Sequence, residues 1–183
     1  LLLWSHALRG LSRGGEAVAP LEQALERNKG KRSPLVARLL LEAASARLAV
    51  DEIVEAFDHL KAAHAIDARN PEGSMLLALV AIDLDDDRTA ERALFTVTGS
   101  PPKTDADRRA QASAFYHLAA MALAKGDGPK ARRLAGKAIS MEPGHPLAQA
   151  LLEKLDSSGS GVVARSSVAP SRPAQSADRE RTS

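Results

Sequence analysis

The sequence contains no cysteine and very few aromatic residues, and each shortage excludes a class of structure or chemistry. Without cysteine the chain cannot form a disulfide, a thiolate metal site or a covalent cysteine nucleophile. Aromatic residues make up 3% of the chain, although hydrophobic residues make up 44%. The apolar content is therefore mostly alanine and leucine, which favour helices, and no long run alternates in the way that a strand requires. The composition predicts an all-α protein.

Membrane-spanning and targeting segments are also missing from the sequence. No apolar run approaches the ~18 residues that a membrane-spanning helix needs. The chain opens on Leu1-Leu2-Leu3-Trp4 without an initiator methionine, and this run is too short for a signal peptide and has no basic flank. We expect the sequence to be a fragment of a larger, bacterial-type protein. The cytoplasm is favoured as its location, and an upstream signal or anchor stays open.

No motif of a known catalytic or metal site is present, so we predict no enzyme, metal or cofactor. A nucleophile elbow, a phosphate-binding glycine loop and a dinucleotide fingerprint are all absent. The acidic run at 83–87 lacks the glycine of a calcium loop, because Arg88 stands in its place, and it is better explained as a solvated turn. No two histidines form the pair of a helical zinc site. We place all five at the surface or its boundary: His6, His59, His64, His117 and His145.

Prolines and capping residues divide the chain into helices. Four prolines follow capping or turn residues and suit the first helical position, where their missing N–H is harmless: Pro34, Pro71, Pro129 and Pro146. Thr104 and Asp107 have the spacing of a capping box, and Asp51 and Asp87 are predicted to cap the helices that follow them. The predicted helices span 1–13, 16–28, 35–49, 52–67, 71–84, 88–98, 105–125, 129–141 and 146–156.

Beyond Asp156 the composition changes to serine, glycine, alanine, proline and arginine. This segment, residues 157–183, has too little apolar surface to offset the entropy of ordering, and we predict a disordered tail. It carries four arginines against two acidic residues, which accounts for the whole net charge of +2. The basic balance therefore describes the tail and does not indicate a nucleic-acid surface.

The helix pairs form a repeat. The last pair reads Phe115-Tyr116-His117-Leu118-Ala119, then Gly126-Asp127 at the turn, then Ala131, Ala138 and Pro143. This order of residues resembles the tetratricopeptide repeat pattern, with Ala119 in place of the usual glycine. Equivalent first positions are Trp4, Leu40, Ser74 and Phe115, spaced by 36, 34 and 41 residues, against a family period of about 34. The loop at 99–103 explains the longest spacing, and the resemblance covers most of residues 1–144.

The resemblance implies a right-handed solenoid of about four antiparallel helix hairpins with a C-terminal capping helix. The repeat domain spans 1–156, with repeats at about 1–33, 34–70, 71–98 and 105–144 and a capping helix at 146–156. In the second, third and fourth repeats, Ala56, Ala90 and Ala131 fall where the two helices cross, because a larger side chain there would force them apart. A generic alanine- and leucine-rich bundle is the alternative, and repeats that keep these residues in phase argue against it.

In the tetratricopeptide family the first helix of each pair lines a concave groove that binds a peptide or a helix. Carried over by position, the groove residues here are mainly apolar and do not form the basic clamp that grips acidic chaperone tails. These residues are Arg38, Leu41, Ser45, Met75, Leu79, Ile82, Tyr116, Ala120 and Leu123. The alternative is that they are ordinary core contacts or are covered by the rest of the parent protein.

We therefore predict a protein–protein interaction scaffold that binds a partner peptide or helix in this groove. A regulatory or substrate-docking segment of a larger enzyme, with its catalytic domain upstream, is the second hypothesis. Nucleic-acid binding is disfavoured, because Arg38 aligns with Glu72 and Ser113 and basic residues do not recur in phase. The identity of the partner and the oligomeric state stay open.

Overall fold

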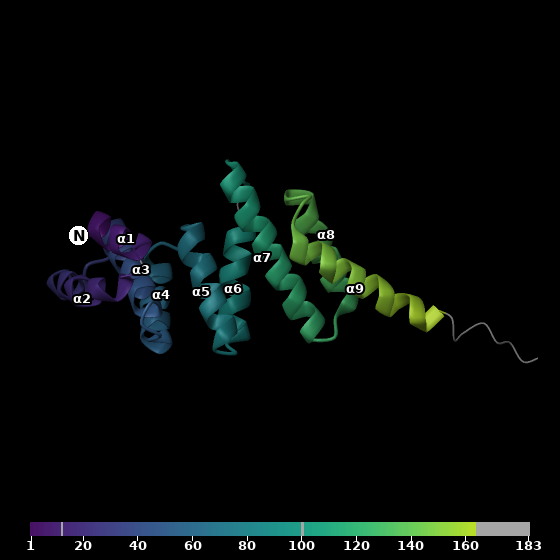
Figure 1. Ribbon diagram of the computed structural model, residues 1–183, viewed down its shortest axis with the longest axis horizontal. Helices are drawn as coiled ribbons and strands as arrows, with labels where there is room; N and C mark the ends of the chain where they lie inside the picture. Colours follow the sequence, from purple (N-terminus) through teal and green to yellow (C-terminus); the bar gives the residue numbers. More distant parts are fainter. Residues whose placement is uncertain (12, 100, 164–183) are drawn as a thin grey trace, which may run out of the picture.

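The computed structural model describes residues 1–11, 13–99 and 101–163 of the 183-residue chain, and every regular element in these ranges is a helix (Figure 1). The α-helices and one short 3-10 helix, η1, follow one another with brief connections. In chain order they are α1 (Leu2–Gly10), η1 (Gly14–Ala17), α2 (Val18–Arg27), α3 (Pro34–Leu48), α4 (Ile53–Ile66), α5 (Pro71–Asp83), α6 (Asp87–Thr98), α7 (Asp105–Ala124), α8 (Gly128–Met141) and α9 (Pro146–Val163).

Consecutive helices pair into hairpins that stack side by side along the long axis of the molecule (Figure 1). The closest packing lies within the pairs α3–α4, α5–α6 and α7–α8, and each pair also packs against the next. Helix α9 covers the last hairpin by packing against α8 and α7. This arrangement confirms the predicted all-α repeat solenoid with a capping helix.

Helix α9 differs from the prediction at its C-terminal end. It continues to Val163 instead of ending at Asp156. A helix that is already packed gains one hydrogen bond per added residue without a new nucleation cost, which allows it to run on into Ser157 and the residues beyond. The remainder of the predicted disordered tail, residues 164–183, lies outside the described residues.

The first hairpin is less regular than the others. Its second helix was predicted over 16–28, but residues 14–17 form η1 and the α-helix begins at Val18. Pro20 explains the difference, because proline has no N–H to donate and fits only the first turn of an α-helix. This hairpin packs on α3 through a hydrophobic cluster of its own, built around Leu8, Leu21 and Leu39.

The main hydrophobic core runs from α3 to α9 and depends on small residues at the helix crossings. Ala56, Ala90 and Ala131 are completely buried in this core, as the repeat register predicts. Larger side chains such as Leu60 and Leu94 are also almost completely buried in this core. Alanine at the crossings lets the two helices approach closely, so the residue pattern and the packing agree.

The turn inside the hairpin has nearly the same geometry in three successive repeats. Asp51, Asp85 and Gly126 adopt left-handed backbone conformations with φ of 63°, 56° and 79°. In each turn the amide of the following residue donates to the carbonyl oxygen five residues earlier, at 3.0, 2.8 and 2.9 Å. This bond closes the first helix with a Schellman-type ending before the second helix starts. The recurrence of the turn supports the repeat assignment independently of the side chains.

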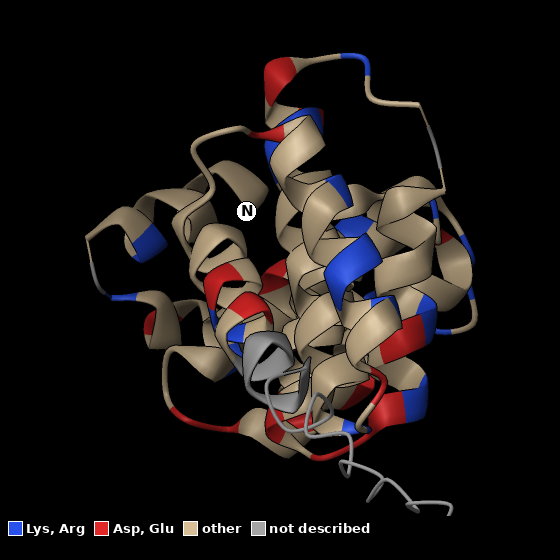
Figure 2. Ribbon diagram, turned by 90° about the vertical axis from the view of Figure 1, so that its right-hand side faces the viewer, with Lys and Arg blue, Asp and Glu red and all other residues tan. Residues whose placement is uncertain are grey.

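The left-handed turn also corrects two predicted caps. Asp51 occupies the left-handed position and Asp87 is already the first residue of α6, so neither caps a helix. Asp86 caps α6 instead, accepting a hydrogen bond from the Thr89 amide at 3.0 Å. These acidic turns gather along the lower edge of the molecule (Figure 2).

The predicted capping box of α7 is confirmed by reciprocal 3.0 Å hydrogen bonds between Thr104 and Asp107.

Glycine in place of Asp85 is expected to stabilise the protein by about 0.5 kcal/mol, because glycine adopts a left-handed backbone without steric cost. The reciprocal change Gly126→Asp should destabilise the fourth repeat, by about 0.5–1 kcal/mol. A Cβ added at Gly126 meets no atom within 4 Å, so the cost would arise from the backbone alone. Urea unfolding of both variants measures the effect. A loss of stability in Asp85→Gly would contradict the strain argument.

Candidate functional site

The first helices of three successive hairpins line a hollow of about 550 Å³, which we call the apolar hollow. Helix α5 lines the hollow with side chains that recur every three to four residues, and α3 and the N-terminal part of α7 line it on either side of α5. The end of α1 completes the lining. Its residues are Arg9, Ser45, Leu48, Pro71, Glu72, Met75, Leu76, Leu79, Ala106, Asp107 and Ala110.

The structure places the nine predicted groove residues in different surroundings. Ser45, Met75 and Leu79 lie together in the apolar hollow, and Arg38 lines a neighbouring one. Leu41 also lines that second hollow, but it is only 6% exposed and belongs to the core, so most of its surface is closed to a partner. The remaining four are half-buried and line neither hollow: Ile82, Tyr116, Ala120 and Leu123.

Helix α7 explains why the predicted residues on it lie elsewhere. The repeat alignment pairs Tyr116 with Met75, but α7 packs directly against α5 and its N-terminal turns bring Ala106 and Ala110 to the apolar hollow. Tyr116 instead lies near the turn that precedes the capping helix, with its ring centroid 5.6 Å from that of His145. Two features of the sequence could have indicated that the start of α7 lines the hollow: the length of this helix and the four-residue spacing of Ala106 and Ala110.

A second hollow of about 470 Å³, the mixed-charge hollow, adjoins the apolar one. Arg9 and Glu72 line both, so the two hollows meet at these residues. Its other lining residues come from α1, α3 and the connection between α4 and α5: His6, Pro34, Ala37, Arg38, Leu41, Glu42, Asp67 and Asn70. Charged side chains thus lie at the border that the apolar hollow shares with the second one.

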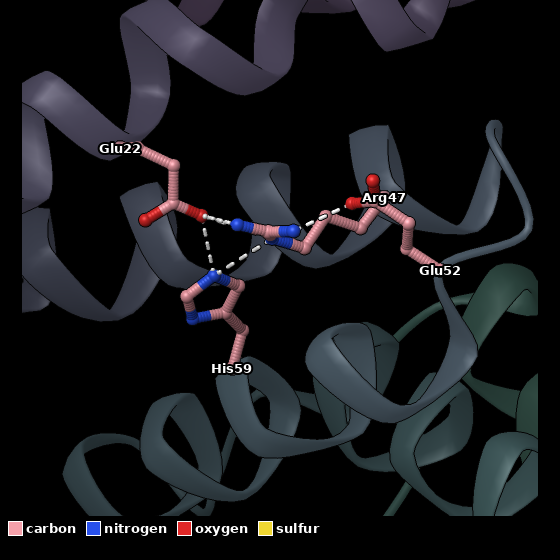
Figure 3. A network of polar contacts seen from close by, with 4 residues as sticks. All are labelled: Glu22, Arg47, Glu52 and His59. Carbon is pink, nitrogen blue, oxygen red and sulfur yellow. Dashed lines mark hydrogen bonds and ion pairs between the residues drawn. The ribbon is translucent and has the colours of Figure 1, made fainter.

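A polar network holds the first hairpin against α3 and α4 (Figure 3). Arg47 on α3 donates to the Glu22 carboxylate at 2.8 and 3.0 Å and to the Glu52 carboxylate at 2.5 Å. His59 on α4 reaches the same oxygen of Glu22 at 2.7 Å. Burial raises the pKa of Glu22, but the hydrogen bonds and charges of His59 and Arg47 outweigh burial and lower it. The carboxylate therefore stays ionised and ties the two hairpins together.

A second polar contact fixes the end of α1 beside the hollows. Glu42 on α3 is 9% exposed, and its carboxylate accepts hydrogen bonds from the Ser5 hydroxyl at 3.2 Å and the Arg9 guanidinium at 3.3 Å. The same guanidinium contacts His6 at 2.7 Å. Because Arg9 is held in this way, α1 becomes part of the groove wall, although sequence reasoning did not include it.

One of the predicted surface histidines is buried. His145 is 6% exposed, and its Nδ1 accepts a hydrogen bond from the Ala148 amide at 3.2 Å, so the ring caps α9. It packs near Tyr116, which shields it from water. Histidine at this turn therefore serves to attach the capping helix, a role that no local sequence pattern predicted.

Acid is expected to destabilise the protein through two histidines. Burial lowers the pKa of His117, and the nearby His145 lowers it further; burial and Arg92 lower the pKa of His64, opposed by Asp67. The unfolded chain, whose histidines titrate near pH 6.5, then binds more protons, so stability falls as the pH drops below about 6.5. Between about pH 7.5 and 5.5 the midpoint of thermal unfolding should fall less for His64→Gln/His117→Gln than for the unmodified protein. An equal fall of the midpoint in both proteins would contradict the assignment of the acid sensitivity to these two histidines.

Other kinds of site find no support in the described ranges. Among residues 1–11, 13–99 and 101–163, no three His, Asp or Glu side chains come together in a way that could hold a metal ion. Over the same part of the chain, no helix is both long and apolar enough to cross a membrane.

Solved structures with the same arrangement include two crystal structures of MamA and one of BtubC (BKLC) from P. vanneervenii. The first MamA structure has a TM-score of 0.70 at 20% identity, covering 86% of this chain and 85% of that one. The second has a TM-score of 0.64 at 19% identity, covering 92% and 94%. BtubC has a TM-score of 0.62 at 15% identity, covering 98% and 84%.

At these identities the likeness shows the fold alone, and it confirms the predicted all-α solenoid of helix hairpins. No protein-family model matches the chain, and no curated protein matches it.

Proposed function

We propose that this protein is an interaction scaffold that binds a segment of a partner protein in the apolar hollow. The observation that carries the proposal is the convergence of α3, α5 and α7 on one hollow of about 550 Å³. Stacked hairpins create extended binding surfaces of this kind, because each repeat adds one more helix to the same face. Leu48, Met75 and Leu79 supply apolar surface that a partner would remove from water.

The chemistry of the lining favours a segment with large apolar side chains. Met75, Leu76 and Leu79 are each half-buried and accessible from the hollow. A flexible methionine can adjust its shape to the side chain that enters. An amphipathic helix that lays its apolar face into a groove uses the same type of surface.

Leu79→Asp is expected to abolish partner binding, because it places a charge in the apolar part of the hollow. Tyr116→Ala should weaken binding if the groove continues along α7 past Ala110. Full-length protein and both variants would be used to capture partners from extracts of the source cells, with quantification by mass spectrometry.

The matched control is Val54→Asp on α4, which changes an exposed aliphatic side chain to the same charge but does not line the hollow. It should retain the partners that Leu79→Asp loses. Circular dichroism and thermal unfolding establish that each variant is folded. Partners retained equally by folded Leu79→Asp would move the binding site away from this hollow.

A further inference from the structure

Most polar residues that line the mixed-charge hollow are already engaged within the protein. Each of these has a hydrogen bond or ion pair to another residue of the chain: His6, Arg9, Glu42, Asp67 and Asn70. Arg38 and Glu72 differ from them. Both are exposed, and neither makes an ion pair or side-chain hydrogen bond to any residue in the described part of the chain. A ligand in this hollow therefore meets one free guanidinium and one free carboxylate.

These two free charges have a defined order relative to the apolar hollow. Glu72 lines both hollows and so lies at their junction, next to Met75 and Leu76. Arg38 lines only the mixed-charge hollow and lies beyond that junction. Passing from one hollow to the other, a bound segment would meet apolar surface first, then the free carboxylate of Glu72 beside the Arg9–Glu42 ion pair, and then the free guanidinium of Arg38.

We infer that the partner segment carries large apolar residues followed by a basic and then an acidic residue, the basic one pairing with Glu72 and the acidic one with Arg38. This inference rests on the proposed function and adds the charge pattern that selects the partner. The apolar residues set the position of the segment, and the order of the two charges is counted outward from them. The basic residue is therefore the nearer one in a segment that runs in either direction along the groove. Charges of this kind add specificity, because the reversed order places like charges together.

The C-terminal segment of the chain itself is a poor occupant. Residues 164–183 contain Val168 as their one large aliphatic residue and have no aromatic or leucine. They could offer charges to Glu72 and Arg38 but nothing to fill the apolar hollow. The required chemistry therefore belongs to a separate partner segment.

Two synthetic helical peptides of identical composition test the inference. Both carry the same stripe of leucines at helical spacing; in one the stripe is followed by Lys and then Glu, and in the other by Glu and then Lys. A third peptide has Gln at both positions. Fluorescence anisotropy with full-length protein should show that the Lys–Glu peptide binds roughly tenfold more tightly than the Glu–Lys peptide, with the Gln peptide between them. The difference should shrink in high salt, because salt screens exposed charges.

Exchange of the two protein charges provides the decisive variant. Arg38→Glu/Glu72→Arg should reverse the preference and bind the Glu–Lys peptide more tightly. The control exchange Glu55→Arg/Arg133→Glu alters exposed residues of α4 and α8 that line neither hollow, and should leave the preference unchanged. All four positions are exposed, which favours folded variants, and Arg38→Gln and Glu72→Gln singly should each reduce the preference.

The outcomes separate this inference from the proposed function. Equal affinity for the two charged peptides, with binding lost in Leu79→Asp, would overturn the charge pattern and leave the groove function intact. A preference that survives the Arg38/Glu72 exchange would also overturn it. Failure of all three peptides to bind would count against the groove function itself.

Discussion

Truncation of Leu94 to alanine is expected to lower the free energy of unfolding by about 3 kcal/mol. Leu94 on α6 is completely buried and lies in the core that runs from α3 to α9. Loss of its side chain removes buried apolar surface and leaves a cavity, and such changes usually cost about 2–5 kcal/mol. In a solenoid each hairpin is supported only by its neighbours, so a defect in the middle hairpin weakens both interfaces. Urea unfolding followed by circular dichroism measures the loss.

The adjacent residue offers a matched control. Phe95 follows Leu94 on the same helix but is 51% exposed. Phe95→Ala should change the stability by no more than about 0.5 kcal/mol, because surface substitutions rarely do more. Similar losses for the two variants would contradict the helix orientation described here.

Enlargement of Ala131 to leucine is expected to destabilise the protein by about 1–3 kcal/mol, for the opposite reason. Ala131 is completely buried in the core on α8, which packs against α7. Additional methylene groups at this position must force neighbouring helices apart or adopt strained rotamers. The loss should appear in thermal unfolding as a lower midpoint. A midpoint that is unchanged would contradict the repeat register in its most regular copy.

Gly136 on the same helix provides the control for Ala131. It is exposed, and a Cβ added there meets no atom within 4 Å. Gly136→Ala should therefore stabilise the protein by about 0.5–1 kcal/mol through helix propensity alone. The two variants both enlarge a small residue of α8, and their opposite effects separate packing from propensity.

The repeat fold could be predicted from the sequence because small and large residues recur in phase. Alanine at positions such as Ala56 and Ala90 is required wherever two helices cross closely, so its spacing reports the hairpin period directly. Proline at Pro34 and Pro71 marks the first turn of two helices, which start at those residues. Each of these signals depends on residues close together in the sequence, so the helices could be predicted without knowledge of the tertiary packing.

The groove was harder to predict because it depends on how hairpins sit against one another. Position in the repeat could not distinguish Leu41, which is almost completely buried in the core, from Met75, which is half-buried and lines the apolar hollow. The approach of Arg9 from α1 depends on its ion pair with Glu42, a contact between residues far apart in sequence. The left-handed backbone at Asp51 was missed because aspartate is also a common helix cap.

The methionines allow the groove to be tested by one NMR measurement. Of the three in the chain, Met75 lines the apolar hollow, Met121 is buried in the core and Met141 lies at the end of α8. Protein labelled with ¹³C at the methionine methyl groups would be titrated with the Lys–Glu peptide. We expect the Met75 signal to shift on binding while those of Met121 and Met141 stay nearly unchanged. A Met75 signal that does not move at saturation, or that moves no more than that of Met141, would contradict binding in this groove.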